Sequence, residues 1–180
     1  IVPCTDASLA DGAAQFSGAA RILAAKSNVF ANYDAAGWAS ALDAVAPAGI
    51  LITSASPQSK DLAARLAARR GISVVQDVVQ IEDGNLTSPI YSGKAMQTVS
   101  LSGNAVVTVR PNVFAAVASD GSTDVSVIDT TGNVATAVQE FMARASTRLD
   151  VAEANIIISG GRGMGSPANF THLEAIADTL

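Results

Sequence analysis

Four glycines and an arginine lie close together between Ser159 and Pro167, in the stretch SGGRGMGSP. Because glycine has no side chain, the main-chain N–H groups of Gly161 and Gly163 can approach a ligand without obstruction. Arg162 adds a permanent charge on a planar fork that matches the oxygens of a phosphate. A helix-like segment follows, and a helix N-terminus contributes partial positive charge. This combination is typical of an anion site, and it best fits the pyrophosphate of a dinucleotide.

The stretch nevertheless differs from the two best-known phosphate-binding loops. Gly161-x-Gly163-x-x-Ser166 has serine where the Rossmann fingerprint has its third glycine. No Gly-Lys-Ser/Thr follows, so the stretch is not a P-loop. Connections between a strand and a helix are often rich in glycine, and an arginine in them is often only solvated. The pattern alone therefore leaves both phosphate binding and a plain tight turn open.

Few other side chains could carry catalytic or metal chemistry. The single cysteine, Cys4, and the single histidine, His172, provide too few ligands for a zinc or haem site. Asp61 and Glu82 have no partner at a useful spacing. We find no Gly-x-Ser-x-Gly elbow and no nucleophile–base pair. The sequence therefore predicts no catalytic residue and no metal site.

Composition describes a globular chain of one domain, or of one domain and a part of another. The 180 residues are 49% hydrophobic and 15% charged, and the mean hydropathy is +0.33. The net charge is −5 and the pI is about 4.6, without a basic stripe. This acidic balance argues against nucleic acid and anionic membranes as partners. No apolar run approaches the ~20 residues of a membrane-spanning helix.

The first half of the chain alternates between helical and strand patterns. The spacing predicts helices over residues 10–25, 33–45 and 59–71, and strands over residues 49–56 and 72–79. In the third helix Gly71 is expected to form the C-terminal cap. A strand, a helix and a strand with short links form a βαβ unit, which implies a parallel sheet. Cationic side chains on that helix are expected on a solvated face: Lys60, Arg65, Arg69 and Arg70.

The second half alternates with period two and carries turn dipeptides such as Asp83-Gly84 and Ser92-Gly93. LTSPIY (86–91), AMQTVSL (95–101) and AVVTVR (105–110) are predicted to be antiparallel strands joined by hairpins. Residues 124–130 form another predicted strand, and residues 138–148 fit a helix or a strand equally well. A strand over 155–159 is then expected to lead into the glycine turn and a helix over 167–180, with Ser166 as its N-cap.

Four stretches, in order along the whole chain, resemble the electron transfer flavoprotein alpha subunit family. SKDLAARLAARRGISVVQDV is similar to its Gly-Lys/Arg-Asp-Leu-x-x-Arg-x-Ala segment and the following strand. SPIYSGKAMQTV and VVTVRPNVF resemble its Pro-x-Tyr-Ala-Gly-x-Ala and Thr-x-Arg-Pro-x-x-Phe stretches. GGRGMGSPANFTHLEAIAD resembles the signature that opens its flavin-binding domain. Ser59 stands where glycine is usual and Met164-Gly165 varies the signature, while the family's later flavin-contacting motifs have no counterpart here.

The resemblance implies an α/β fold in two pieces. Residues 1–150 would be a scaffold similar to the adenine-nucleotide hydrolase-like fold, with a mostly parallel sheet flanked by helices and an antiparallel hairpin portion. Its first strand and helix are expected to be missing. Residues 151–180 would be the first strand, turn and helix of a flavodoxin-like FAD-binding domain that is truncated here.

The resemblance also implies a function as an electron carrier. FAD would take electrons from flavin dehydrogenases, such as the acyl-CoA dehydrogenases of fatty acid β-oxidation, and pass them to a quinone-linked oxidoreductase. The chain would be the alpha subunit of a heterodimer and would not turn over a substrate itself. A beta subunit would hold AMP, and the complex would work in the bacterial cytoplasm or the mitochondrial matrix. Arg162, with Gly161 and Gly163 beside it, is the residue expected to contact FAD.

Two alternatives come from other classes of protein. The βαβ unit and the glycine turn also fit a nucleotide-dependent enzyme on a Rossmann-like sheet. That enzyme would need an acidic ribose ligand and a proton-transfer residue near the turn, and we find neither. The second alternative is a non-catalytic interaction domain in which the glycine turn is only a connection.

Overall fold

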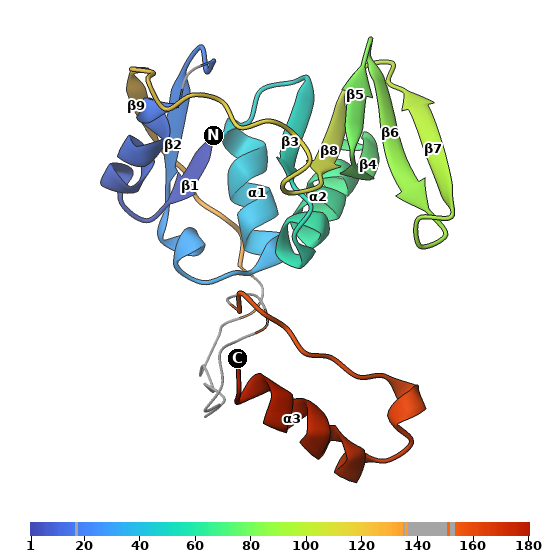
Figure 1. Cartoon of the computed structure of the whole chain (residues 1–180). Helices are drawn as coiled ribbons and strands as arrows, with labels where there is room; N and C mark the ends of the chain where they lie inside the picture. The colour runs from blue at the N-terminus through green and yellow to red at the C-terminus, as the bar shows by residue number, and fades with distance from the viewer. Residues whose placement is uncertain (17, 135, 137–150, 152–153) are drawn as a thin grey trace. The chain divides into compact units, whose positions relative to one another are not determined.

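The computed structural model describes residues 1–16, 18–134, 136, 151 and 154–180 (Figure 1). The chain forms two compact units, residues 1–138 and residues 139–180. The first unit holds three small sheets, and the second holds the glycine turn and a short helix. The domain boundary near residue 150 stays a prediction.

The first sheet of unit 1 is parallel and has the order β1-β2-β9. Its strands are β1 (Val2–Cys4), β2 (Ile22–Lys26) and β9 (Val125–Asp129). Ala24 packs with Ala10 of the 3-10 helix η1 (Ala7–Gln15), whereas Ala25 packs with Ala41 and Leu42 of α1 (Ala35–Val45). Because neighbouring residues of a strand face opposite ways, η1 and α1 cover opposite faces of this sheet.

The helix expected over residues 10–25 was therefore wrong in its second part. The helical turns end at Gln15, and Gly18 follows with a φ of 89°, a conformation that a helix cannot continue through. Ala24 and Ala25 lie on β2 and are completely buried, one under η1 and the other under α1. Their small size serves close packing on a strand, which the alanine-rich pattern did not distinguish from helix propensity.

The second sheet is also parallel, with the order β3-β8-β4. Its strands are β3 (Ile50–Ser54), β8 (Ala105–Val109) and β4 (Ser73–Val78). Helix α2 (Pro57–Arg70) joins β3 to β4 and covers one face, where Leu66 packs against Val106. The strand predicted over 105–110 is thus confirmed, but its antiparallel pairing was wrong. It is the central strand of a parallel sheet, and its nearly continuous burial is typical of that position.

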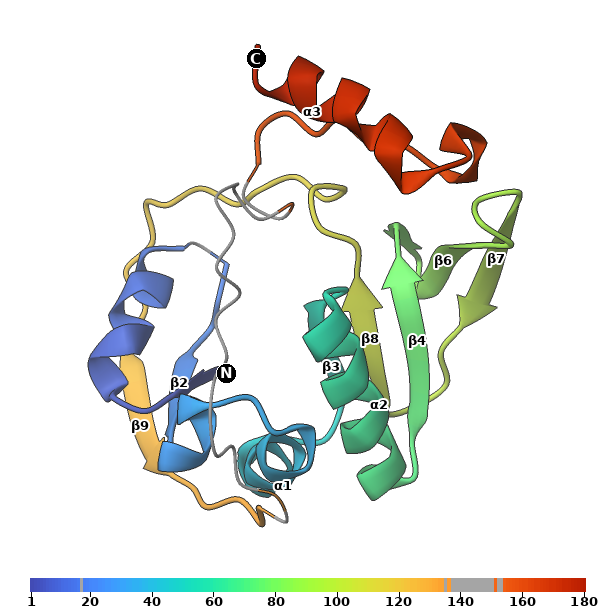
Figure 2. The same cartoon turned by 90° about the horizontal axis from the view of Figure 1, so that it is seen from below.

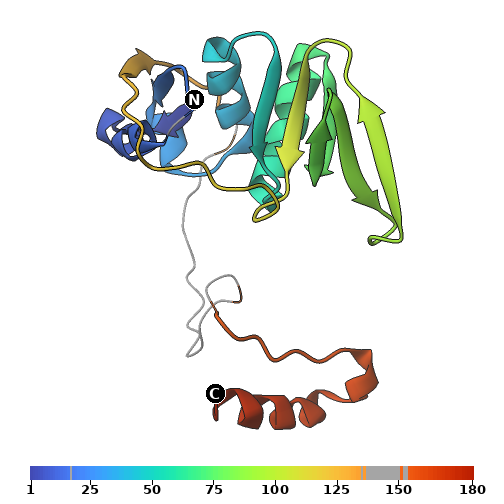
Figure 3. The same ribbon diagram turned by 45° about the horizontal axis from the view of Figure 1, so that its top comes forward.

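The third sheet is antiparallel, as predicted for this region. It comprises β5 (Gln80–Glu82), β6 (Asn85–Ile90) and β7 (Ala95–Ser100). Leu86 of β6 packs with Val78, Ala105 and Val107, on the face of the second sheet that α2 does not cover. Figure 3 shows this hairpin layer beside β4 and β8.

Unit 2 contains two single-turn 3-10 helices, η3 (Arg162–Met164) and η4 (Pro167–Phe170), and α3 (Thr171–Ala177). The helix expected over 167–180 is an α-helix only from Thr171 to Ala177, and Ser166 caps the 3-10 turn η4 before it, where its side chain accepts a hydrogen bond from the N–H of Ala168 at 3.4 Å. The strand expected over 155–159 was wrong. Residues 155–159 pair with no strand in the described part of the unit, and the side chains of Ile156 and Ile157 are exposed. The segment predicted over 138–148 lies outside the described residues.

The α/β class is confirmed, with parallel sheets flanked by helices and a separate antiparallel part. The predicted C-terminal cap of α2 at Gly71 is confirmed, whereas the helix begins at Pro57, before the start predicted at residue 59. Ser56 caps its N-terminus by accepting from the N–H of Ser59 at 3.1 Å, and Gly71 ends it with a φ of 62°. The predicted helix over 33–45 and the predicted strand over 124–130 are confirmed as α1 and β9.

Candidate functional site

The glycine turn of unit 2 is a compact loop held by its own main chain. Gly161 O accepts from the N–H of Met164 at 3.0 Å, and Arg162 O accepts from the N–H of Gly165 at 3.1 Å. The side-chain Nδ2 of Asn169 donates to Met164 O at 2.7 Å and ties the loop to η4. These contacts fix the loop that carries Arg162.

The glycines of this loop fall into two groups with different structural requirements. A Cβ on Gly160 would lie 2.7 Å from Leu173 Cδ1 and 3.0 Å from Met164 Cγ, so these side chains would have to shift to make room for it. Gly165 has a φ of 74°, which favours glycine for its conformation. Gly161 and Gly163 would meet nothing within 4 Å and have no positive φ. Neither packing nor conformation explains these two glycines.

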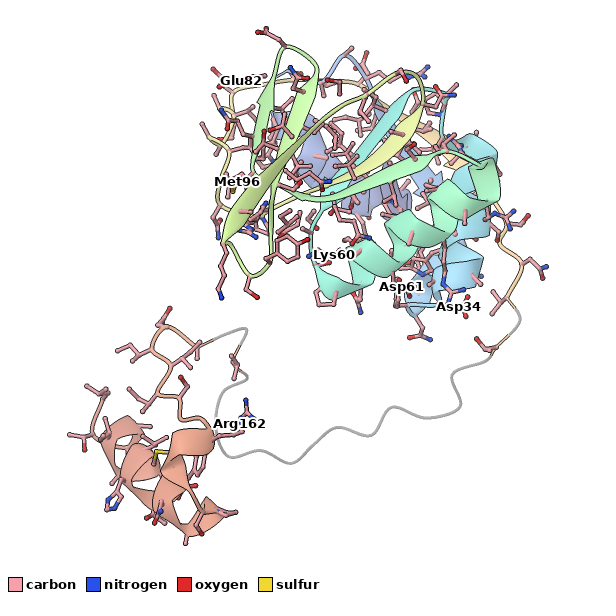
Figure 4. The ribbon with its side chains drawn as sticks, turned by 90° about the vertical axis from the view of Figure 1, so that its right-hand side faces the viewer. Asp34, Lys60, Asp61, Glu82, Met96 and Arg162 are labelled. Carbon is pink, nitrogen blue, oxygen red and sulfur yellow. The ribbon has the colours of Figure 1, made fainter. Side chains whose placement is uncertain are left out.

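Hydrogen-bond donors are available at the same two glycines. Within the part of the chain that the structure describes, no hydrogen bond uses the N–H of Gly161, Arg162 or Gly163. Arg162 is exposed and forms no ion pair with any described residue, and Figure 4 shows it reaching outward from the loop. Open main-chain donors beside a free guanidinium can bind an anion, and they offer no group for proton transfer.

The other side chains considered from the sequence do not form a site. His172 is exposed on α3, and Glu82 is exposed on β5. Asp61 pairs with Arg65 at 3.2 Å and accepts a hydrogen bond from the hydroxyl of Tyr33. Figure 4 shows Lys60 and Asp61 on α2 and Glu82 on the antiparallel sheet. No three potential metal ligands gather among the described residues.

A charged cluster that the sequence pattern did not reveal lies at the carboxyl ends of β4 and β8. Arg110 donates to the carboxylate of Asp77 through Nε at 3.1 Å and through Nη2, and Lys60 Nζ lies 3.9 Å from the same carboxylate. Asp77 has a φ of 61° at the irregularity of β4, where its N–H donates to the buried hydroxyl of Thr108 at 2.9 Å. The antiparallel assignment of β8 hid this pair, because only parallel strands bring these two ends together.

The cluster joins two of the stretches that carry the family resemblance. Asp77, Arg110 and the turn Tyr91-Ser92-Gly93 line one open hollow. The hydrogen bonds from Arg110, with the charge of Lys60, lower the pKa of Asp77 below its ordinary value. Asp77 therefore stays ionised and paired at neutral pH, which suits a structural role for the cluster.

Arg70 is the second contact that the sequence did not reveal. Its guanidinium donates to Asp43 Oδ1 at 2.7 Å and to the carbonyls of Asp43, Ala46 and Pro47 at 3.0, 2.7 and 2.9 Å. The expected solvated face is therefore wrong for Arg70, whose side chain is only 16% exposed. The guanidinium of Arg70 therefore caps the C-terminal end of α1, where the free carbonyls favour a positive charge.

None of the described helices combines the length and apolar character needed to cross a membrane.

Comparison with known proteins gives one consistent family. Residues 2–149 match the model of the family described as "Electron transfer flavoprotein domain". The chain is 33% identical to the electron transfer flavoprotein subunit alpha of Mycobacterium leprae, over 99% of this chain and 58% of that protein. It is 32% identical to the subunit of the same name from Bacillus subtilis, over 91% of this chain and 54% of that protein. It is 35% identical to protein FixB of Clostridium saccharobutylicum, over 73% of this chain and 43% of that protein. The chain thus spans about half the length of the curated relatives that it matches.

Proposed function

The chain belongs to the electron transfer flavoprotein domain family, and from that premise we propose that it is part of an electron-carrying alpha subunit that binds FAD. Its electrons would come from flavin dehydrogenases, such as those that act on acyl-CoA, and would pass to a quinone-linked oxidoreductase. The subunit would act together with a beta subunit, and AMP would be held by that partner. This is a redox carrier and not an enzyme that turns over a substrate of its own.

The observation that carries the proposal is the pair of glycines that the fold does not require. Gly161 and Gly163 have room for a side chain and an ordinary backbone conformation, yet both are glycine. Close approach of a ligand to the main chain is one physical reason for a glycine at such a position. The N–H groups of residues 161–163 and the guanidinium of Arg162, which have no partner among the described residues, fit the phosphates of FAD, which are anions.

Each group in the loop would have a distinct role in binding. The guanidinium of Arg162 would pair with a phosphate through two parallel N–H donors, which fixes the orientation of the phosphate as well as its charge. The open N–H groups would add shorter-range hydrogen bonds. Gly160 and Gly165 would keep the loop in shape without touching the ligand. The flavin, when bound, supplies the redox chemistry.

Unit 1 would serve as the scaffold of the subunit. The carboxylates of its two best-formed clusters, Asp43 and Asp77, are already paired with arginines. This arrangement suits a domain that holds its shape and packs on a partner.

Arg162→Ala in the whole protein, purified with its partner subunit, tests the proposal. Loss of a charge-assisted contact to phosphate is worth about 1.5–3 kcal/mol, so FAD affinity should fall about 10- to 100-fold. The FAD affinity of Arg162→Lys should lie between those of the wild type and of Arg162→Ala, because lysine keeps the positive charge but lacks the planar pair of N–H donors. Flavin absorbance per protein and a titration of FAD into the apoprotein give the measurement.

Arg65→Ala is the matched control, since Arg65 is an exposed arginine on α2 far from the glycine turn in sequence. It should leave FAD affinity unchanged. Unchanged flavin content and unchanged partner assembly in Arg162→Ala would instead support the interaction-domain alternative, in which the loop is only a connection.

A further inference from the structure

The dipeptide Asp-Gly occurs at three places in the chain, residues 11–12, 83–84 and 120–121. An aspartate before a glycine can react with its own main chain, because glycine has no side chain to hinder the approach of its nitrogen to the aspartate carboxyl group. All three pairs lie among the described residues. The structure therefore shows which of three identical dipeptides is free to react.

Two of the pairs are held by main-chain hydrogen bonds. Asp11 and Gly12 lie inside the 3-10 helix η1, in which each N–H donates to the carbonyl three residues earlier. The N–H of Gly121, the residue after Asp120, donates to Gln15 O at 2.8 Å. In both pairs the glycine nitrogen can reach the carboxyl carbon of its aspartate only after a hydrogen bond breaks.

The third pair forms the turn between β5 and β6, in which Glu82 pairs with Asn85. Asp83 and Gly84 are both exposed. Figure 2 shows β6 and β7 at the opposite end of unit 1 from β2 and β9, and Figure 4 shows Glu82, the residue before the turn, at the outer end of the hairpin layer. No described residue accepts a hydrogen bond from the N–H of Gly84. Movement of this nitrogen therefore costs no hydrogen bond within the described protein.

The backbone of this turn is also close to the conformation that the reaction needs. Asp83 has a φ of 49° and Gly84 a φ of 79°, and positive values at both central residues make the turn type I′. A planar five-membered ring closed through the nitrogen of Gly84 requires the ψ of the aspartate to be about −120°. A type II′ turn has that ψ at its first central residue, together with a φ of about +60°.

Type II′ is the other common turn that joins two strands through two residues. Turning over the peptide between Asp83 and Gly84 converts one type into the other, and glycine tolerates the change in its own φ. Asp83 keeps its positive φ, so the strands on either side can stay paired. The same change of ψ at Asp11 would break the 3-10 helix.

We infer that Asp83-Gly84 is a site of spontaneous modification, at which the aspartate converts to isoaspartate through a succinimide. In the first step the nitrogen of Gly84 bonds to Cγ of Asp83, and its proton leaves with the carboxyl hydroxyl group as water. In the second step water adds to the main-chain carbonyl carbon of Asp83, the bond from that carbon to the nitrogen breaks, and the nitrogen regains a proton. The chain then runs through Cβ and Cγ, and the former main-chain carbonyl becomes a free carboxylate.

The product lengthens the main chain of the turn by one atom. A two-residue turn sets the register of its strands, here Glu82 opposite Asn85. β5 is three residues long and exposed throughout, so the added atom should loosen β5 first. β6 should stay in place, because Leu86 packs against Val78 and Val107 of the second sheet.

Incubation of the whole protein at neutral pH and physiological temperature for several weeks tests the inference. Peptide mapping by mass spectrometry, with enzymatic methylation of the isoaspartyl carboxylate by a labelled methyl donor, gives the isoaspartate at each position. The amount at position 83 should exceed that at position 11 or 120 by at least about fivefold, the rate factor for breaking one ordinary hydrogen bond. Equal amounts at the three positions, or more at either of the other two, would overturn the inference.

Two controls separate the fold from the neighbouring residues. In urea the three pairs lose their different surroundings, so the excess at position 83 should largely disappear. An excess that persists in the unfolded chain would mean that the fold does not select the site. Asp83→Glu keeps the charge but would need a six-membered ring, so it should remove the product at position 83 and leave the other two positions unchanged. A product that persists at position 83 in this variant would contradict the succinimide. Neither measurement involves the flavin, so this inference does not depend on the proposed function.

Discussion

Replacing Arg70 with alanine should be the most destabilising change of a charged residue on α2. The side chain bridges two helices, because it leaves the last turn of α2 and donates four hydrogen bonds to the end of α1 and to Pro47. Three of these bonds go to carbonyls, and the fourth goes to the carboxylate of Asp43. Alanine removes all four at once.

The magnitude follows from the number of bonds and from their exposure. A net contribution of about 1 kcal/mol per hydrogen bond would give about 4 kcal/mol for the set. Water can reach the released carbonyls, because Ala46 and Asp43 are only partly buried and Pro47 is exposed. The loss should therefore be about 2–3 kcal/mol of unfolding free energy. Arg70→Lys keeps the ion pair but cannot span four acceptors, so about half of that loss is expected.

Urea unfolding followed by tryptophan fluorescence measures the loss, since Trp38 lies on α1 and packs at 5.1 Å from the ring of Phe30. Arg65→Ala is the control on the same helix. Its exposed pair with Asp61, four residues away, should be worth no more than about 0.5 kcal/mol. If Arg70→Ala and Arg65→Ala had the same midpoint, the bridge between the helices would contribute nothing measurable.

Two further changes test the glycine loop and the charged cluster. Gly160→Ala should destabilise unit 2 by roughly 1 kcal/mol because its Cβ would press on Leu173 and Met164, whereas Gly161→Ala should be nearly neutral for folding and should weaken FAD binding. Thermal unfolding measures the loss of stability of each variant, and a titration with flavin measures the loss of affinity. Equal losses of stability in the two variants would refute the distinction. The pKa of Asp77 is lowered in the folded protein, so its ionised carboxylate stabilises the fold above pH about 4. This contribution to the unfolding free energy disappears as the pH falls through the pKa that Asp77 has in the folded protein. Asp77→Asn should therefore flatten the fall in stability below pH 4, and a pH series of urea midpoints that matches wild type in shape would contradict this.

Local signals in the sequence were enough for the elements that depend on their own residues. The end of α2 was predicted from Gly71, which acts within one turn of the helix, whereas the start at Ser56 and Pro57 lies before the predicted residue 59. The turn at Asp83-Gly84 follows in the same way from a positive φ at both residues. Such features need no knowledge of what lies next to them in space.

Features that depend on distant residues could not be predicted in this way. The pairing of β8 is set by β3 and β4, and a five-residue apolar run has the same composition in a hairpin or in a central parallel strand. The contacts of Arg70 reach residues 23 to 27 positions away, so its helix pattern alone marked it as solvated. At the glycine turn the residues of the candidate site could be named from the sequence, but Gly160 and Gly161 could not be told apart, because only the packing distinguishes them.

The position of β8 also has a consequence for how the chain assembles during synthesis. β3 and β4 do not pair with each other, since β8 lies between them, and β8 is made only after the whole β5-β6-β7 hairpin layer. As the chain leaves the ribosome, the edges of β3 and β4 that pair with β8 stay unpaired until residue 109 has emerged. The hairpins can form locally within microseconds, whereas the parallel sheet depends on contacts of long sequence separation. In the interval between the synthesis of β3 and that of β8, these unpaired strand edges are therefore open to aggregation.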